Sequence, residues 1–181
     1  MPVDTRLIYD DFCQLPDDGK RYEIIDGKLF VTPAPYLVHQ RVVTRLTSYL
    51  AGFVENHKLG EVFVSPFDVV FCEFDVVEPD LLYISKARAS VLTPKNVQGA
   101  PDLVVEVLSE TTAKRDRSIK LKLYGQYGVQ EYWVIDPDVP SADIYRRAVG
   151  GLELAAKLAA ADALTSPLFP GFSLPLKKLV E

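Results

Sequence analysis

Cysteine is scarce in this chain, and its scarcity argues against a fold held together by disulfides or zinc. The two cysteines, Cys13 and Cys72, lie far apart in the sequence and show no metal-ligand spacing. Disulfide frameworks and structural zinc sites need more cysteines at characteristic spacings. We therefore expect two buried, reduced thiols.

Long apolar runs are also lacking. No stretch of the sequence approaches the roughly 18 consecutive apolar residues of a membrane span. Residues Met1 to Arg6 do not show the basic and then apolar pattern of a secretory signal. We expect a soluble, cytoplasmic protein with no membrane partner. No Gly-x-Gly-x-x-Gly motif follows a candidate strand, which argues against a dinucleotide-binding enzyme.

Positive charge is in deficit, because the net charge at neutral pH is −5. Indiscriminate binding to nucleic acid depends on cationic side chains that neutralise phosphates, so this balance argues against it but leaves room for a local basic cleft. The densest basic cluster comprises Lys114, Arg115, Arg117, Lys120 and Lys122. Taken alone, this cluster is best explained as a solvated helix face.

Apolar residues make up 48% of the 181 positions, enough for one globular domain over residues 1–181 with a sizeable core. Hydrophobic periodicity and turn residues predict strands at 21–25, 28–31, 61–64, 68–71, 80–84, 102–108, 131–136, 142–147 and 152–154. Helices are expected at 7–15, 37–56 and 114–127, whereas 155–163 fits a short helix or a continued strand. This order indicates an α/β sandwich whose central mixed β-sheet is flanked by helices.

Two predicted strands carry carboxylates inside apolar runs, where an unpaired charge is costly unless a cation compensates it. Asp80 begins one strand, and Asp102 and Glu106 lie on the other. Because side chains alternate along a strand, Glu106 shares a face with Asp102 and is the deeper of the two. Carboxylates from adjacent strands can converge on one hard cation, so we expect Asp80 and Glu106 to bind Mg²⁺ or Mn²⁺.

The helix after the second acidic strand carries Asp116, Lys120 and Tyr124 at intervals of four, which places them on one face. Lys120 can therefore approach Glu106 from the helix and stabilise charge that develops on a phosphoryl oxygen. Together these residues indicate metal-assisted phosphodiester chemistry.

Each of these residues also has an ordinary structural explanation. An Asp after a proline commonly caps a turn, and Glu106 could form a buried salt bridge with Lys or Arg. Lys120 on an amphipathic helix is commonly exposed, and Asp116 and Lys120 could be only an i,i+4 ion pair.

Several stretches resemble the Uma-two family of restriction-endonuclease-like proteins, within the PD-(D/E)XK nuclease superfamily. The resemblance spans nearly the whole chain and is carried by residues 21–27, His39-Gln40, Glu78-Pro79-Asp80, 100–109, Arg115-Asp116 with Lys120 and Tyr124, and 128–137. Jointly these stretches are specific to the family.

The resemblance implies a restriction-endonuclease-like fold in which Asp80, Glu106 and Lys120 carry catalysis. Leu108 stands where the superfamily has its lysine, two positions after Glu106, so the lysine must come from the helix. Glu23 and His39 also match family positions, as an additional acid and a polar or proton-handling group. Both have structural alternatives, since Glu23 could face solvent at a hairpin edge and His39 could be a hydrogen-bonded structural histidine.

Two functions from different classes follow. The first is a magnesium-dependent endonuclease that hydrolyses nucleic acid, with DNA as the expected substrate. The second is a catalytically inactive binding or oligomerisation module that keeps the fold and an ion-pair network, which Leu108 and the acidic charge favour. Supporting roles are expected for Glu23, His39, Asp102, Asp116 and Tyr124, and a homo-oligomer, a dimer, is expected.

Overall fold

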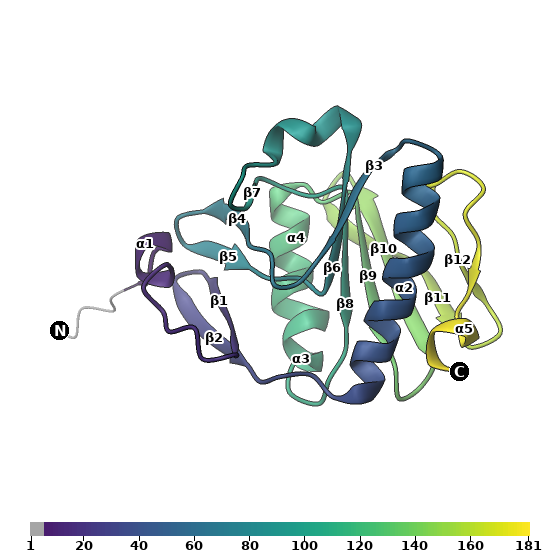
Figure 1. Cartoon of the computed structure of the whole chain (residues 1–181), viewed down its shortest axis with the longest axis horizontal. Coiled ribbons are helices and arrows are strands. Elements are labelled where there is room, and N and C mark those ends of the chain that lie inside the picture. Colours follow the sequence, from purple (N-terminus) through teal and green to yellow (C-terminus); the bar gives the residue numbers. More distant parts are fainter. Residues whose placement is uncertain (1–5) are drawn as a thin grey trace.

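A six-stranded sheet forms the centre of the computed structural model, which describes residues 6–181 (Figure 1). Its strand order is β11-β10-β9-β8-β6-β3. The strands are β3 (Gly60–Val64), β6 (Leu81–Ser85), β8 (Leu103–Val107), β9 (Glu131–Asp136), β10 (Ser141–Ala148) and β11 (Gly151–Ala159). Because β8 and β9 pair in parallel while the other neighbours are antiparallel, the sheet is mixed, as predicted.

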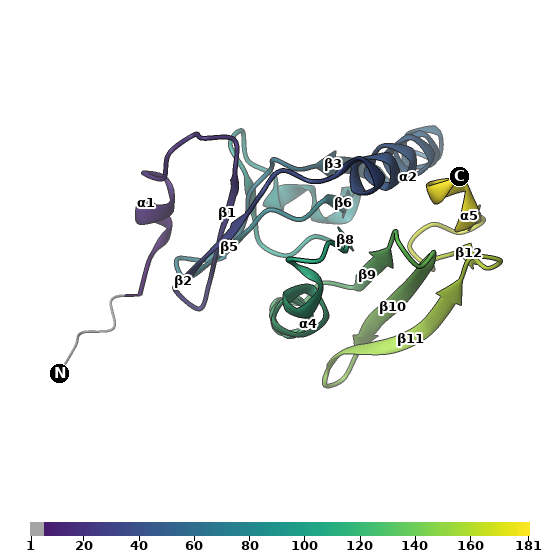
Figure 2. The same ribbon diagram turned by 90° about the horizontal axis from the view of Figure 1, so that it is seen from below.

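A second sheet lies beside the first and has the order β2-β1-β5-β4-β7 (Figure 2). Its strands are β1 (Arg21–Ile25), β2 (Lys28–Thr32), β4 (Val69–Cys72), β5 (Asp75–Val77) and β7 (Val97–Gln98). The turn between β1 and β2 has positive φ at Asp26 (53°) and Gly27 (71°). This backbone is the one that an Asp-Gly hairpin turn requires. The short strands β5 and β7 were not predicted.

The two faces of the central sheet are covered by different helices. Helix α2 (Leu37–Asn56) packs Val42, Leu46 and Leu50 against one face, in a cluster with Val105 and Val107 of β8. The opposite face packs against Tyr124 and its neighbours, in a cluster with Val104, Leu108 and Tyr132. The alternation predicted for residues 102–108 is therefore confirmed.

The predicted helix over 114–127 is one continuous helical segment with a wider turn inside it. It consists of α3 (Ala113–Arg115), a π-helical turn η2 (Asp116–Lys120) and α4 (Leu121–Tyr127), which ends at Gly128 with φ of 96°. The interpretation of its basic cluster as a solvated face is wrong for two members. Lys120 is fully buried and Arg115 is largely so, because both turn toward acidic side chains.

The remaining elements are short, namely α1 (Tyr9–Phe12), a 3₁₀ helix η1 (Lys86–Val91), β12 (Ala163–Leu164), β13 (Leu174–Pro175) and α5 (Lys177–Val180). Residues 155–159 continue β11, so the strand alternative holds for that part of 155–163. Both cysteines are free thiols, but the prediction that both are buried is wrong, since Cys13 is exposed and Cys72 is half-buried. Among residues 6–181, no helix combines the length and apolarity needed to cross a membrane.

Candidate active site

Asp80 is held at the start of β6 by three donors from separate parts of the chain. Its Oδ1 accepts a hydrogen bond from Nη1 of Arg21 at 2.6 Å. Its Oδ2 accepts from the backbone amide of Val107 at 2.8 Å and contacts Nε2 of His39 at 3.0 Å. Burial opposes ionisation of this carboxyl, but the hydrogen bond of His39 and the charge of Arg21 outweigh burial and lower the pKa of Asp80 to about 2.

Glu106 lies in the middle of β8 on the face that the segment 113–127 covers. Its Oε1 accepts hydrogen bonds from Nζ of Lys120 at 2.6 Å and from the hydroxyl of Tyr124 at 2.8 Å. Burial raises the pKa of Glu106 to about 8, and the neighbouring carboxylates Asp116, Asp80 and Glu23 add to this effect against the opposing charge of Lys120. Glu106 therefore sits in an excess of negative charge.

Lys120 joins three carboxylates at the last position of the π-helical turn. Besides Glu106, its Nζ lies 2.7 Å from Oε1 of Glu23 and 3.8 Å from Oδ1 of Asp116. Burial alone would lower the pKa of Lys120, but these carboxylates raise it above the usual value for lysine. The expectation that a lysine here is commonly exposed is wrong, and the i,i+4 contact with Asp116 is the weakest of its three ion pairs.

Glu23 is buried, so the alternative in which it faces solvent at a hairpin edge is wrong. Strand β1 lies between β2 and β5 and is not an edge strand. In addition to Lys120, Glu23 accepts a hydrogen bond from the backbone amide of Glu78 at 3.0 Å and forms an ion pair with Arg115 at 3.3 Å. The carboxylate thus connects the second sheet to the helical segment 113–127.

These side chains form an acidic cluster with too few cations to neutralise it. The cluster contains the carboxyl groups of Glu23, Glu78, Asp80, Glu106 and Asp116 and the cations Arg21, Arg115 and Lys120. Among residues 6–181, Oε2 of Glu23 and Oδ1 of Asp116 are buried atoms without a hydrogen bond, and their nearest cations are Arg115 at 3.3 Å and Lys120 at 3.8 Å. Buried polar atoms of this kind call for an explanation, such as an ion.

The donor set fits a hard divalent cation in charge and in ligand type, because oxygen ligands are what Mg²⁺ and Mn²⁺ select. The present side-chain positions do not form a finished cage. Within the part of the chain that the structure describes, no group of three or more His, Cys, Asp or Glu residues is arranged to hold an ion. Arg21 and Lys120 instead lie against the two carboxylates predicted to bind metal.

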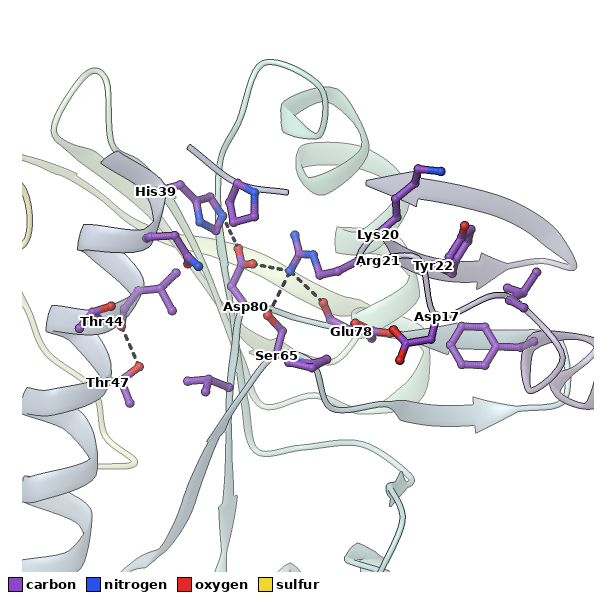
Figure 3. Close-up of a pocket in the computed structure, with 18 of the residues that line it drawn as sticks. Asp17, Lys20, Arg21, Tyr22, His39, Thr44, Thr47, Ser65, Glu78 and Asp80 are labelled. Atoms are coloured by element: carbon purple, nitrogen blue, oxygen red, sulfur yellow. Dashed lines mark hydrogen bonds and ion pairs between the residues drawn. The ribbon is translucent and has the colours of Figure 1, made fainter. Parts of the chain in front are cut away.

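A cavity of about 670 Å³ opens beside Asp80 (Figure 3). Its walls come from the chain before β1, from α2 and from the turn after β3, and its lining includes Arg21, His39, Glu78 and Asp80. In Figure 3 the side chain of Arg21 reaches between Asp80 and Glu78. A cavity of this size suits a ligand of a few hundred daltons or one part of a larger one.

The structure brings together most of the residues singled out from the sequence. They form two neighbouring groups. One pairs Asp80 with His39, and the other joins Lys120 to its contacts Glu106, Tyr124, Glu23 and Asp116. The backbone of Glu78 links the two groups, because its carbonyl accepts from Arg21 and its amide donates to Glu23. Asp102 joins neither group, because its Oδ2 accepts a hydrogen bond from the amide of Ser85 at 2.7 Å at the other end of β8.

Sequence reasoning missed Arg21, Arg115 and Glu78. A signal for Arg21 was present, because residues two apart on a strand share a face, and Arg21 precedes Glu23 by two positions. Arg115 lies among other basic residues of the same helical segment, so only its place in the family-matching pair Arg115-Asp116 marked it.

A mixed sheet between helices, with a buried cluster of carboxylates and a lysine beside a cavity, defines a protein of the restriction-endonuclease-like class. The Uma2 family, described as "Putative restriction endonuclease", matches residues 9–177. The chain belongs to this family, which confirms the resemblance seen in its sequence.

A solved structure has the same fold. It is titled a "putative nuclease belonging to DUF820" from Anabaena variabilis and is 21% identical to this chain. The similarity covers 96% of this chain and 97% of that chain, with a TM-score of 0.80. The predicted fold is confirmed by this match. No curated protein matches the chain.

Proposed function

We propose that this chain is a divalent-metal-dependent nuclease that hydrolyses phosphodiester bonds of nucleic acid, with DNA as its substrate. The observation that carries the proposal is the contact of 2.6 Å between Lys120 and Glu106 inside a cluster with more carboxylates than cations. Membership of the Uma2 family supports a nuclease of this kind.

Asp80 and Glu106 would hold Mg²⁺ or Mn²⁺, which supplies a Lewis acid and an activated water when it is bound. Lys120 would stabilise negative charge on the phosphoryl group, because its ammonium is fixed by ion pairs and shielded from water. His39 orients Asp80, Tyr124 orients Glu106, and Glu23 and Asp116 position Lys120. These four residues are positioning residues in the proposal, whereas Asp102 only braces the start of β8.

The test is cleavage of assorted DNA and RNA by purified protein with Mg²⁺, with Mn²⁺ and with a chelator. We expect cleavage that needs the divalent ion and that falls at least about 100-fold in E106Q, since loss of one preorganised charged group commonly has that effect. E153Q is the matched control, because Glu153 is exposed on β11. Intact substrates with both metals would refute the nuclease proposal.

A catalytically inactive binding module is the second candidate, and one observation favours it. The carboxylates that would bind metal already have side-chain cations as partners, Arg21 on Asp80 and Lys120 on Glu106. If this candidate is right, calorimetric titration with Mg²⁺ or Mn²⁺ will show no binding, while salt-sensitive binding of uncleaved nucleic acid persists.

The proposal includes a homodimer as the assembly. Sedimentation velocity at several protein concentrations will give a mass of twice 20.2 kDa if the dimer is stable. A single species of 20.2 kDa at every concentration would refute it.

A further inference from the structure

Arg21 is a half-buried arginine with few close partners. Its only short hydrogen bond in residues 6–181 is the one to Oδ1 of Asp80 at 2.6 Å, since the contacts with Oγ of Ser65 and the carbonyl of Glu78 are both 3.4 Å long. Its Nε is buried and has no hydrogen-bond partner among the described residues. A guanidinium has five N–H donors, and the described residues engage few of them at short distance.

Asp80 has one oxygen that can change partners. Its Oδ2 is fixed by His39 and by the backbone amide of Val107 in β8. Its Oδ1 is covered by Arg21. A cation can use Oδ1 as a ligand only after the guanidinium has moved away, because both would occupy the same side of the oxygen and would repel each other.

Arg21 and Lys120 differ in their access to the cavity. The side chain of Lys120 is 2% exposed and enclosed by Glu23 and Glu106, whereas that of Arg21 is 19% exposed and lines the cavity (Figure 3). A phosphodiester that enters the cavity therefore meets Arg21 first. Guanidinium groups match phosphate oxygens with two parallel hydrogen bonds, so a phosphate can compete with a single carboxylate oxygen.

We propose that Arg21 is a displaceable counter-ion of Asp80 that couples phosphate binding to divalent-cation binding; this inference rests on the metal site proposed above. Without substrate, Arg21 neutralises Asp80 and weakens cation binding. With a phosphodiester in the cavity, the guanidinium turns to the phosphate and uncovers Oδ1. Because coupling between two ligands is reciprocal, each ligand strengthens binding of the other by the same factor.

Calorimetric titration of Mn²⁺ tests the coupling, with and without a short phosphorothioate-linked DNA oligonucleotide that resists cleavage. In the wild-type chain we expect the oligonucleotide to tighten Mn²⁺ binding about tenfold, within the usual range of such couplings. In R21Q, Mn²⁺ alone should bind about as tightly as it binds the wild-type chain with DNA, and the oligonucleotide should add less than about twofold.

K20Q is the matched control. Lys20 lines the same cavity and carries the same charge, but its ion pair is with Asp18 at 2.6 Å and not with Asp80. We expect K20Q to keep the coupling. Loss of coupling in K20Q as well would show a general charge effect and overturn the role of Arg21.

The outcomes separate this inference from the proposed function. If wild-type and R21Q proteins bind Mn²⁺ equally and the oligonucleotide changes neither, the coupling is refuted while the metal site stands. If neither protein binds Mn²⁺ under any condition, the metal site fails and the coupling fails with it. If thermal melting shows that R21Q does not fold, the wild-type titrations still test the coupling, and its absence there refutes the inference.

Discussion

Lys120 is the residue on which the stability and the proposed chemistry of the site both depend. Replacing it with Met leaves Glu106 and Glu23 buried without their shared cation, which should cost about 3–5 kcal/mol of unfolding free energy. Because Glu106 can take up a proton and so lose its charge, we expect a smaller cost below about pH 6 than above about pH 8. Urea unfolding at several pH values measures this.

K122M is the control for this substitution, since Lys122 is exposed on the same helical segment. It should change the unfolding free energy by less than about 0.5 kcal/mol. A K120M protein that is as stable as K122M at alkaline pH would contradict the assignment of Lys120 as the cation of the cluster.

Glu78 provides a separate test of the electrostatics at residue scale. Burial raises its pKa from 4.5 to about 7, with smaller contributions from Asp68 and Glu23. A raised acid pKa means that the folded state holds its proton longer, so the stabilisation is complete below about pH 4.5 and is lost as the pH rises through 7. E78Q should therefore be more stable than the wild type by about 1 kcal/mol at pH 8, a value reduced for the partial exposure of Glu78.

The same comparison at about pH 3.5 should show a difference near zero, because Glu78 is then mostly protonated in both states of the chain. Thermal melting of both proteins across this range gives the two curves. Parallel curves would show that Glu78 titrates normally.

Single site residues could be predicted from the sequence where their immediate neighbours made them unusual. Glu106 stands out because its neighbours on the strand are all apolar, and Asp80 because it follows a proline at the start of such a run. Burial of Lys120 and Arg115 could not be read in the same way, because a basic helix face has the same composition whether it meets water or carboxylates.

At the scale of elements, the long helices and most strands follow from periodicity, whereas the two-residue and three-residue strands do not. Strands β5 and β7 are too short to show a period of two and exist through pairing with neighbours. The π-helical turn is likewise invisible in the sequence, although it ends at Lys120 and widens the helix beside Glu106.

A lysine placed at position 108 tests whether the cation of the cluster must come from the helical segment. Leu108 is buried on the same side of the chain as Glu106, two positions further on. Alone, L108K should lower the unfolding free energy by about 2–4 kcal/mol, because it replaces a packed leucine with a buried charge.

In a K120M background, L108K should instead recover about 1–2 kcal/mol, because the new ammonium faces carboxylates that lack a cation. Chemical unfolding of the four proteins gives the interaction energy of the pair. Additive effects would show that position 108 cannot serve the cluster.

At the scale of the whole molecule, the acidic cluster holds the two sheets together. Glu23 comes from the second sheet, Glu106 from the central one and Lys120 from the helical segment between them (Figure 2). E23Q removes one charge from this junction. It should lower the local stability of β1 and leave the local stability of β10 in the central sheet unchanged.

Hydrogen exchange followed by mass spectrometry checks this expectation. We expect amides of β1 to exchange about tenfold faster in E23Q, equivalent to about 1.4 kcal/mol of local stability. Amides of β10 should keep their wild-type rates. Equal acceleration in both strands would indicate global destabilisation instead of a loosened junction.

The supply of the lysine from a helix also changes which mutations the family can tolerate. Glu106 and Lys120 are 14 positions apart, and residues 108–112 connect their elements. An insertion or deletion in this connection shifts the register of the helical segment by about 100° per residue and turns the ammonium away from its carboxylate. In a nuclease whose acid and lysine share one strand, the same length change would leave the pair intact. Homologues of this chain should therefore vary in residue type across 109–112 but hold its length constant.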